Sequence, residues 1–331
     1  MVTIDQRDVE RKVLAILKIL SRATEPLGAR TIARELEAYG VNLTERAVGY
    51  HLQLMDERGL TMQVGREGRI ITERGRNEAS SALVTDKVGY VIARITLLAF
   101  QTTFDPLSGQ GQVVMNTAFF RRRDFEAALQ AMEPAFKAGL AVSDRVAVAY
   151  PGQRLGPMPV PEDYVGFSTV CSVTVNGVLL KAGIPIDSRF GGILEMRGHR
   201  PHRFVELIHY SGSSLDPSEA FIRARMTEVG NTVHTGTGRI LANFRELPAP
   251  CRPLVEEKAA QLQAAGIRGL LFLGEVSESV CQIPVDLNMC GMILLGGLNP
   301  VAAAAEAGIE ADYRAMSTVL PFESLREFRS L

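Results

Sequence analysis

An internal duplication constrains the fold of this chain of 331 residues more than any other feature of its sequence. The pattern Gly109-x-Gly111-x-Val113-x-x-Asn116 returns about 127 residues later as Gly236-x-Gly238-x-Ile240-x-x-Asn243. In both copies the glycines are followed by a helical pattern and then by strand-like apolar runs. Because matching segments at a fixed separation indicate repeated architecture, we expect residues 88–200 and 201–331 to be two copies of one unit. The mixture of helices and strands within each copy predicts an α/β (α+β) fold.

The paired glycines invite comparison with a nucleotide-binding loop. Gly109 and Gly111, like Gly236 and Gly238, precede a strand instead of following one, and neither pair completes the G-x-G-x-x-G pattern. We therefore expect structural turns at both positions and no dinucleotide cofactor.

Neither a metal centre nor a catalytic set is indicated. His199 and His202 form an H-x-x-H pattern, but Pro201 interrupts any helix that would direct both rings to one ion. The four cysteines include no C-x-x-C pair, which favours buried, reduced thiols. Because no G-x-S-x-G elbow or Walker loop is visible, we expect no enzyme, and an enzyme with an appended N-terminal domain is the weaker alternative.

The first 83 residues are organised differently from the duplicated part. Apolar residues at helical spacing predict helices over residues 6–22, from Ala29 to Gly40 and from Thr44 to Gly59. Two short strands on either side of residues 65–68 then predict a hairpin. Three helices and a hairpin follow the order of a winged helix-turn-helix, so we expect residues 1–83 to form that domain, with a boundary near residues 84–88.

The third predicted helix is the expected DNA-reading element. Val48, Leu52 and Met55 point inward, which leaves the opposite face to a duplex, where glutamine reads adenine and tyrosine or threonine holds phosphate. Residues 1–83 carry 13 basic and 12 acidic residues, a net charge of 13 − 12 = +1, so a winged helix that binds protein is an alternative. The expected DNA-binding residues are Thr44, Arg46, Tyr50, Gln53, Arg66 and Arg69.

Composition and charge place the chain among ordinary globular proteins. Apolar residues make up 46% and charged residues 22% of it. The 36 Lys and Arg residues against 37 Asp and Glu residues give a net charge of −1, which excludes a polybasic binder. The apolar runs are far shorter than the roughly 20 residues of a membrane helix, and the acidic N-terminus does not fit a secretory signal. We therefore expect a cytoplasmic protein with no membrane span.

The winged helix, the duplicated unit and two short motifs resemble the NrpR-type nitrogen-regulatory repressor family. The motifs are Leu241-Ala242-Asn243-Phe244-Arg245-Glu246-Leu247-Pro248 and Gly296-Gly297-Leu298-Asn299-Pro300, and the N-terminal part is similar to the winged-helix domain also named after ribonuclease R. The resemblance spans essentially the whole chain. It implies a dimeric transcriptional regulator that binds palindromic operators and is released from DNA by 2-oxoglutarate. Related third helices commonly read R-x-V-R-Y-H-L, whereas Gly49 here takes the place of the second arginine, which implies a different operator or weaker binding.

A small dicarboxylate effector requires a cation, backbone N–H groups and hydroxyl or amide donors. Three parts of the duplicated region offer such groups at expected turns or strand ends, namely residues 188–192, residues 210–214 and the asparagines of the two family motifs. Each residue has a structural alternative as a turn, a helix cap or an ion-pair partner. The candidate effector-binding residues are Arg189, Gly191, Gly192, Ser213, Ser214, Asn243, Arg245 and Asn299.

The leading hypothesis is therefore an effector-controlled regulator that binds double-stranded DNA as a homodimer. In it the duplicated domain dimerises and binds the effector, and the ligand favours a half-site spacing that no longer matches the DNA. A winged-helix scaffold for protein assembly is the alternative. The two are distinguished by salt, because counterion release makes DNA binding strongly salt-dependent.

Overall fold

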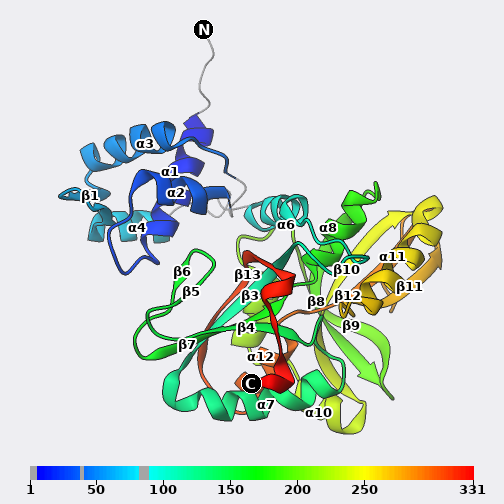
Figure 1. Ribbon diagram of the computed structural model, residues 1–331. Helices are drawn as coiled ribbons and strands as arrows, with labels where there is room; N and C mark the ends of the chain where they lie inside the picture. The colour runs from blue at the N-terminus through cyan, green and yellow to red at the C-terminus, as the bar shows by residue number, and fades with distance from the viewer. Residues whose placement is uncertain (1–5, 38–40, 82–88) are drawn as a thin grey trace. The chain divides into compact units, whose positions relative to one another are not determined.

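The computed structural model describes residues 6–37, 41–81 and 89–331 and divides the chain into two compact units (Figure 1). One unit is built on the first 97 residues and includes Gly212–Ser214, and the other comprises residues 98–211 and 215–331. The expected helix end at Gly40 and the expected domain boundary at residues 84–88 lie outside the described residues.

The N-terminal unit has the predicted order of three helices and a hairpin. Its elements are α1 (Gln6–Leu20), α2 (Ala29–Glu37), α3 (Glu45–Glu57), β1 (Thr61–Val64), β2 (Gly68–Ile71) and α4 (Glu73–Ser81), followed by α6 (Tyr90–Gln101), which crosses into the second unit. The predicted inward residues Val48, Leu52 and Met55 are all buried, in one core with Ile16 and Ile32 of the first two helices. This core confirms the predicted orientation of the third helix.

The hairpin is tied to the turn before α2. Leu27 and Arg69 exchange two backbone hydrogen bonds, each of 3.0 Å. Gly68 permits this approach, because a Cβ there would lie 2.3 Å from the carbonyl carbon of Leu27. The wing is therefore held to the helices by main-chain pairing rather than by its side chains alone.

The second unit contains two five-stranded antiparallel sheets. The strand order is β13-β3-β7-β4-β14 in one sheet and β11-β12-β10-β8-β9 in the other. The central strands are buried along nearly their whole length, which explains why their apolar residues run without alternation. The elements are β3 (Gln112–Arg121), α7 (Phe125–Lys137), β4 (Arg145–Ala149), β5 (Arg154–Leu155), β6 (Met158–Pro159), β7 (Tyr164–Val170), α8 (Val173–Lys181), β8 (Asp187–Arg197), β9 (Arg200–His209), α9 (Pro217–Arg223), α10 (Val229–Thr235), β10 (Gly238–Pro248), α11 (Arg252–Ala264), β11 (Leu270–Val276), β12 (Met289–Leu295), α12 (Asn299–Glu306), β13 (Ala311–Pro321) and β14 (Arg326–Glu327).

The two sheets exchange two strands, one in each direction. The order β3-α7-β4-β7-α8-β8 repeats as β10-α11-β11-β12-α12-β13, yet β8 pairs with β10 and β13 pairs with β3. Each stretch of repeated sequence therefore supplies its last long strand to the sheet of the other. As a consequence, neither repeated stretch completes a sheet by itself.

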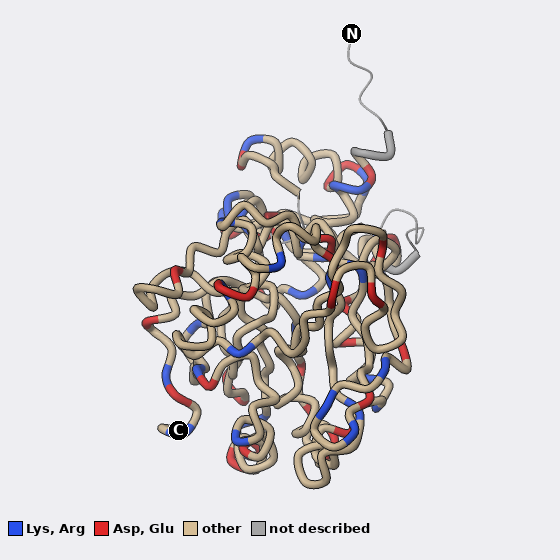
Figure 2. Tube along the Cα trace, turned by 90° about the vertical axis from the view of Figure 1, so that its right-hand side faces the viewer, with Lys and Arg blue, Asp and Glu red and all other residues tan. Residues whose placement is uncertain are grey.

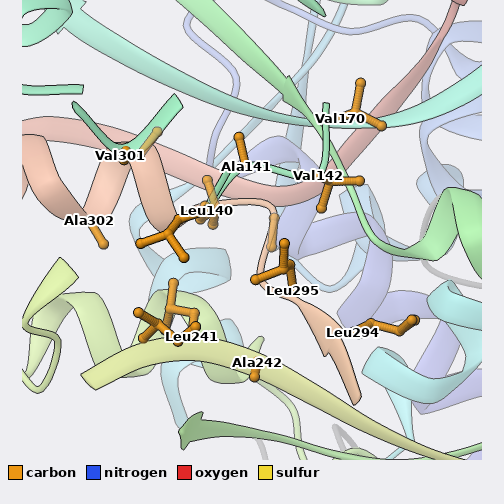
Figure 3. Close-up of a cluster of buried hydrophobic side chains, with 14 of the residues drawn as sticks. Leu140, Ala141, Val142, Val170, Leu241, Ala242, Leu294, Leu295, Val301 and Ala302 are labelled. Atoms are coloured by element: carbon orange, nitrogen blue, oxygen red, sulfur yellow. The ribbon is translucent and has the colours of Figure 1, made fainter. Parts of the chain in front are cut away.

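A continuous core joins the two sheets. Its residues come from both repeated stretches, and Figure 3 shows part of it, with Leu140 and Val142 near Leu241 and Leu295. Because the strands are exchanged and both sheets contribute side chains to one core, we expect the two sheets to unfold together.

Several local expectations need correction. Gly191 and Gly192 lie within β8 and not in a turn, and Asn243 and Arg245 lie inside β10 and not after a strand. The glycines are required by close packing: a Cβ on Gly191 would lie 2.8 Å from the Pro217 side chain, and one on Gly192 would lie 2.6 Å from a backbone oxygen. By contrast, the turns predicted at the repeated glycine pairs are confirmed, because all four glycines have positive φ angles.

Charged residues of both signs are scattered along the chain (Figure 2). Glu195 is an example: hydrogen bonds from Arg203 at 2.7 Å and from Arg197 at 2.8 Å lower the pKa of its carboxyl to about 2. Within the described ranges, no helix combines the length and apolar character that crossing a membrane requires. Over the same ranges, no group of three histidine, cysteine or acidic side chains is placed to hold a metal ion.

Candidate effector site and nucleic-acid interface

The exposed face of α3 carries the side chains expected to meet DNA. Thr44 caps the helix, with its side-chain oxygen accepting from the Ala47 N–H at 3.2 Å. Arg46, Tyr50 and Gln53 are exposed, and Tyr50 retains 62% of its surface. The helix therefore presents one cation, one phenol and one amide on the side opposite the core.

The two arginines of the wing differ in their surroundings. Arg66 lies in the turn between β1 and β2 and is exposed. Arg69 is half-buried, and its Nε donates to Asp56 at 2.7 Å, while Thr61 donates to the other oxygen of the same carboxylate at 2.6 Å. The charge of Arg69 is thus balanced within the domain, whereas Arg66 points its charge to solvent.

A buried polar cluster surrounds Arg245 on β10. The side chain of Arg245 is 1% exposed, and its guanidinium lies 4.9 Å from the centre of the Tyr210 ring. Its Nη1 donates to the Phe244 carbonyl at 3.1 Å, and its Nε is buried without a hydrogen-bond partner. The carboxylate of Asp216 acts electrostatically on the same two neighbours, Tyr210 and Cys171, on which Arg245 acts. A buried guanidinium with an N–H group that lacks an acceptor can take a further hydrogen bond, so the site is suited to receive a carboxylate oxygen.

Neutral hydrogen-bonding groups complete the cluster. The Tyr210 hydroxyl donates to Asn243 Oδ1 at 2.5 Å, and Asn243 Nδ2 donates to Ser172 Oγ at 3.1 Å and to the Leu295 carbonyl at 3.4 Å. Ser172 directly precedes α8, which belongs to the first repeated stretch, whereas Asn243 lies on β10 of the second. The cluster is thus assembled from both stretches.

Burial keeps two titratable neighbours of Arg245, Tyr210 and Cys171, neutral. Desolvation raises the pKa of Tyr210 to about 12, although the nearby Arg245 charge opposes this shift. Desolvation likewise raises the pKa of the Cys171 thiol to about 11. At neutral pH Tyr210 and Cys171 are therefore uncharged, and the cluster offers the guanidinium of Arg245 beside neutral donors and acceptors, an arrangement that can bind a carboxylate.

Arg189 lies apart from Arg245. It occupies an irregularity in the pairing of β8 with β10, and its Nη1 lies 3.1 Å from Asp187, 3.3 Å from Asp286 and 3.7 Å from Glu246. Neighbouring residues of a strand point to opposite faces, so Glu246 and its partner Arg189 lie across the sheet from the Arg245 side chain. Desolvation raises the pKa of the buried Glu246, and Arg189 opposes that shift.

The remaining candidates are distributed as follows. Gly191 packs beneath the cluster, since a Cβ there would lie 3.0 Å from the Tyr210 hydroxyl, whereas Gly192 packs against Phe204. Asn299 is fully buried and bonds both backbone groups of Leu241, which is a structural role. Residues 212–214, which include Ser213 and Ser214, group with the N-terminal unit.

Three members of the cluster were not among the predicted residues. Tyr210, Ser172 and Cys171 lie far from Arg245 in the chain. Tyr210 follows β9 of one sheet, Cys171 and Ser172 follow β7 of the other, and only the tertiary fold brings them to Arg245. The sequence did signal the segment that begins at Tyr210, but as a source of serine hydroxyls. No pattern distinguished Ser172 from other buried polar residues.

Comparison with known proteins agrees with this architecture. Residues 88–327 match the family described as NrpR regulatory domains NRD1 and 2, and residues 14–79 match the ribonuclease R winged-helix domain. The chain is 38% identical to the global nitrogen regulator NrpRI of Methanosarcina mazei, over 96% of this chain and 98% of that protein. It is 33% identical to the global nitrogen regulator NrpR of Methanocaldococcus jannaschii over 97% of this chain, and spans 56% of that longer protein.

A solved structure gives the same result. The crystal structure of a nitrogen repressor-like protein from Methanococcus jannaschii is similar to this chain with a TM-score of 0.61 and 29% identity, over 72% of this chain and 98% of that one. The curated relatives are named as regulators and not as enzymes. Since a single family match covers most of the chain and a relative matches it nearly end to end, the chain belongs to the NrpR family of nitrogen regulators.

Proposed function

We propose that this protein represses nitrogen-assimilation genes by binding operator DNA as a homodimer in the cytoplasm, and that 2-oxoglutarate releases it from DNA. Membership of a family of transcription regulators supports the general role. The observation that carries the effector part is Arg245, a cation 1% exposed whose Nε has no hydrogen-bond partner in the described structure.

The exposed face of α3 supports the DNA-binding half of the proposal. In a winged helix the third helix enters the major groove and the wing reaches the neighbouring backbone. Arg46 and Gln53 would meet base edges, while Tyr50 and the capped helix start at Thr44 would hold phosphates. Arg66 would reach the backbone from the wing, and Arg69 would contribute less because Asp56 already balances its charge.

The chemistry of the buried cluster supports a carboxylate ligand. One carboxylate would take N–H groups of Arg245, a charge-assisted interaction that is strong where water is excluded. The rest of a small dicarboxylate would be held by neutral donors such as Tyr210, Asn243 and Ser172. Because these residues come from both repeated stretches, a ligand would alter how the stretches pack and thereby the half-site separation of a dimer.

Fluorescence anisotropy with a labelled duplex from the upstream region of the protein's own gene tests the proposal. We expect binding that weakens steeply between 50 and 200 mM salt, by about 10³-fold or more if six phosphates are contacted. Addition of 2-oxoglutarate should weaken it at least tenfold, whereas propionate, which carries one carboxylate, should have little effect. Binding to this duplex that is unaffected by 2-oxoglutarate at millimolar concentration would refute the effector assignment.

A protein-binding winged helix is the second candidate function. Tyr50 is 62% exposed and Met62 is 54% exposed, so the N-terminal unit displays two large side chains with apolar surface. Such residues are enriched in protein interfaces. A partner bound through them would dissociate little more at 200 mM salt than at 50 mM, and the same salt series therefore separates the two functions.

A further inference from the structure

The two repeated asparagines occupy matching positions but make different hydrogen bonds. Asn116 lies on β3 opposite Thr169 of β7, and Asn243 lies on β10 opposite Leu294 of β12. Asn116 Oδ1 accepts from the backbone N–H of Met316 at 3.0 Å, whereas Asn243 Oδ1 accepts from the Tyr210 hydroxyl. One asparagine is therefore bound to the main chain and the other to a side chain.

The positive charge is present in only one of the two positions. Arg245 follows Asn243 on the same face of its strand, and the corresponding place after Asn116 is taken by Ala118, which is fully buried. Ala118 is uncharged, so the position that matches Arg245 provides no cation to bind a carboxylate. The hydrogen bonds described for Asn116 involve Thr169 and Met316, neither of which is charged.

Close packing also leaves no room for a ligand beside Asn116. Gly297 stands where the repeat places Ser172, and a Cβ on Gly297 would lie 2.4 Å from Asn116 Nδ2 and 2.6 Å from the Val170 carbonyl. The Thr169 hydroxyl donates to the Gly297 carbonyl at 2.7 Å. The space that a ligand would need beside Asn116 is therefore occupied by the polypeptide backbone.

The hydrogen bonds of Asn116 anchor an irregular part of the exchanged strand β13. The pairing of β13 with β3 shifts between Arg314 and Thr318, and Met316 has a φ angle of 50°. On either side of it, the Ala315 N–H donates to Glu219 at 2.9 Å and Ser317 shares a hydrogen bond of 2.7 Å with Thr117. A non-glycine residue with such a backbone conformation persists only where its neighbours hold it.

We infer that each chain binds one small dicarboxylate, at the Arg245 cluster, and that the matching position at Asn116 is a structural clamp for β13. This inference rests on the proposed function. It assigns different roles to two asparagines that the duplication made equivalent: Asn243 contacts the ligand, and Asn116 holds the strand that the second repeated stretch supplies to the first sheet.

Titration calorimetry of the full chain with 2-oxoglutarate tests the inference, with Asn116→Ala and Asn243→Ala as a matched pair. The unsubstituted chain should bind one ligand per chain. Asn243→Ala should raise the Kd at least about tenfold, the loss of one buried hydrogen-bonding group. Asn116→Ala should leave the Kd within about threefold of the unsubstituted protein and lower the melting temperature by roughly 2–8 °C.

The outcomes separate this inference from the function on which it rests. Two ligands per chain, or an Asn116→Ala variant whose Kd rises as much as that of Asn243→Ala, would overturn the inference and leave the effector assignment in place. Absence of any binding by the unsubstituted chain would overturn both. Because stoichiometry is measured on the unsubstituted protein, the test holds even where a variant fails to fold.

Discussion

Replacement of Arg245 by methionine separates the two roles that this side chain can have. The guanidinium is 1% exposed, hydrogen-bonded to the Phe244 carbonyl at 3.1 Å and stacked on Tyr210 at 4.9 Å. If the residue binds the effector, Arg245→Met removes the ligand's positive partner. If the residue only supports the fold, the substitution leaves ligand binding intact and reduces stability.

The expected loss of effector affinity is large. A hydrogen bond to a charged group contributes about 1.5–3 kcal/mol, and a carboxylate held by two guanidinium N–H groups loses about 3–4 kcal/mol when both disappear. This corresponds to a Kd of 2-oxoglutarate raised by about two to three orders of magnitude. DNA should then stay bound at ligand concentrations that release the unsubstituted protein.

The expected effect on stability is small. Loss of the Tyr210 contact and of the bond to Phe244 costs about 1 kcal/mol each. Against this, methionine fills a similar elongated space without a charge to desolvate, which offsets part of that loss. We expect a melting temperature close to that of the unsubstituted protein.

Arg239→Met is the matched control for this experiment. Arg239 lies on the same strand but is half-exposed, and its distance from Glu228 is 3.9 Å, so its ion pair is worth less than about 1 kcal/mol. Calorimetry and DNA release should be unchanged in this variant. An Arg245→Met protein that binds 2-oxoglutarate normally but melts well below the unsubstituted chain would refute the assignment of Arg245 to the ligand.

Three further predictions concern other parts of the molecule. Gly49→Arg should strengthen DNA binding and make its salt dependence steeper, by the amount expected for about one more phosphate contact. The added side chain has room, because nothing lies within 4 Å of a Cβ at that position. Gly49→Ala gains only helix propensity and should leave the salt dependence unchanged. Glu195→Gln should lower the melting temperature at pH 7. The difference in melting temperature between the variant and the unsubstituted protein should vanish as the pH falls from about 4.5 toward about 2, because a carboxyl whose pKa is lowered in the folded state stabilises that state only while it is ionised. Gly297→Ala should destabilise the protein by about 1–3 kcal/mol in urea unfolding, because its Cβ would overlap Asn116, and unchanged stability would contradict the packing described there.

The sequence by itself determined the local elements and their order. The inward residues of α3 and the Thr44 cap follow from helical spacing and from the few side chains that can satisfy a helix start. The repeated glycines predicted their own turns, because only glycine readily takes positive φ angles. The duplication was visible because it repeats residues at a fixed separation, and Arg245 was a candidate because it is a cation within one of the two family motifs.

Tertiary structure alone decided which distant residues meet. The exchange of β8 and β13 between the sheets leaves no trace in periodicity, because a strand has the same pattern whichever neighbour it pairs with. For the same reason the glycines at 191 and 192 resembled a turn until Tyr210 and Phe204 were seen to pack against them. The charge of Arg245 is a property of the sequence, but its burial beside Tyr210, Asn243 and Ser172 arises only when two remote segments fold against one core.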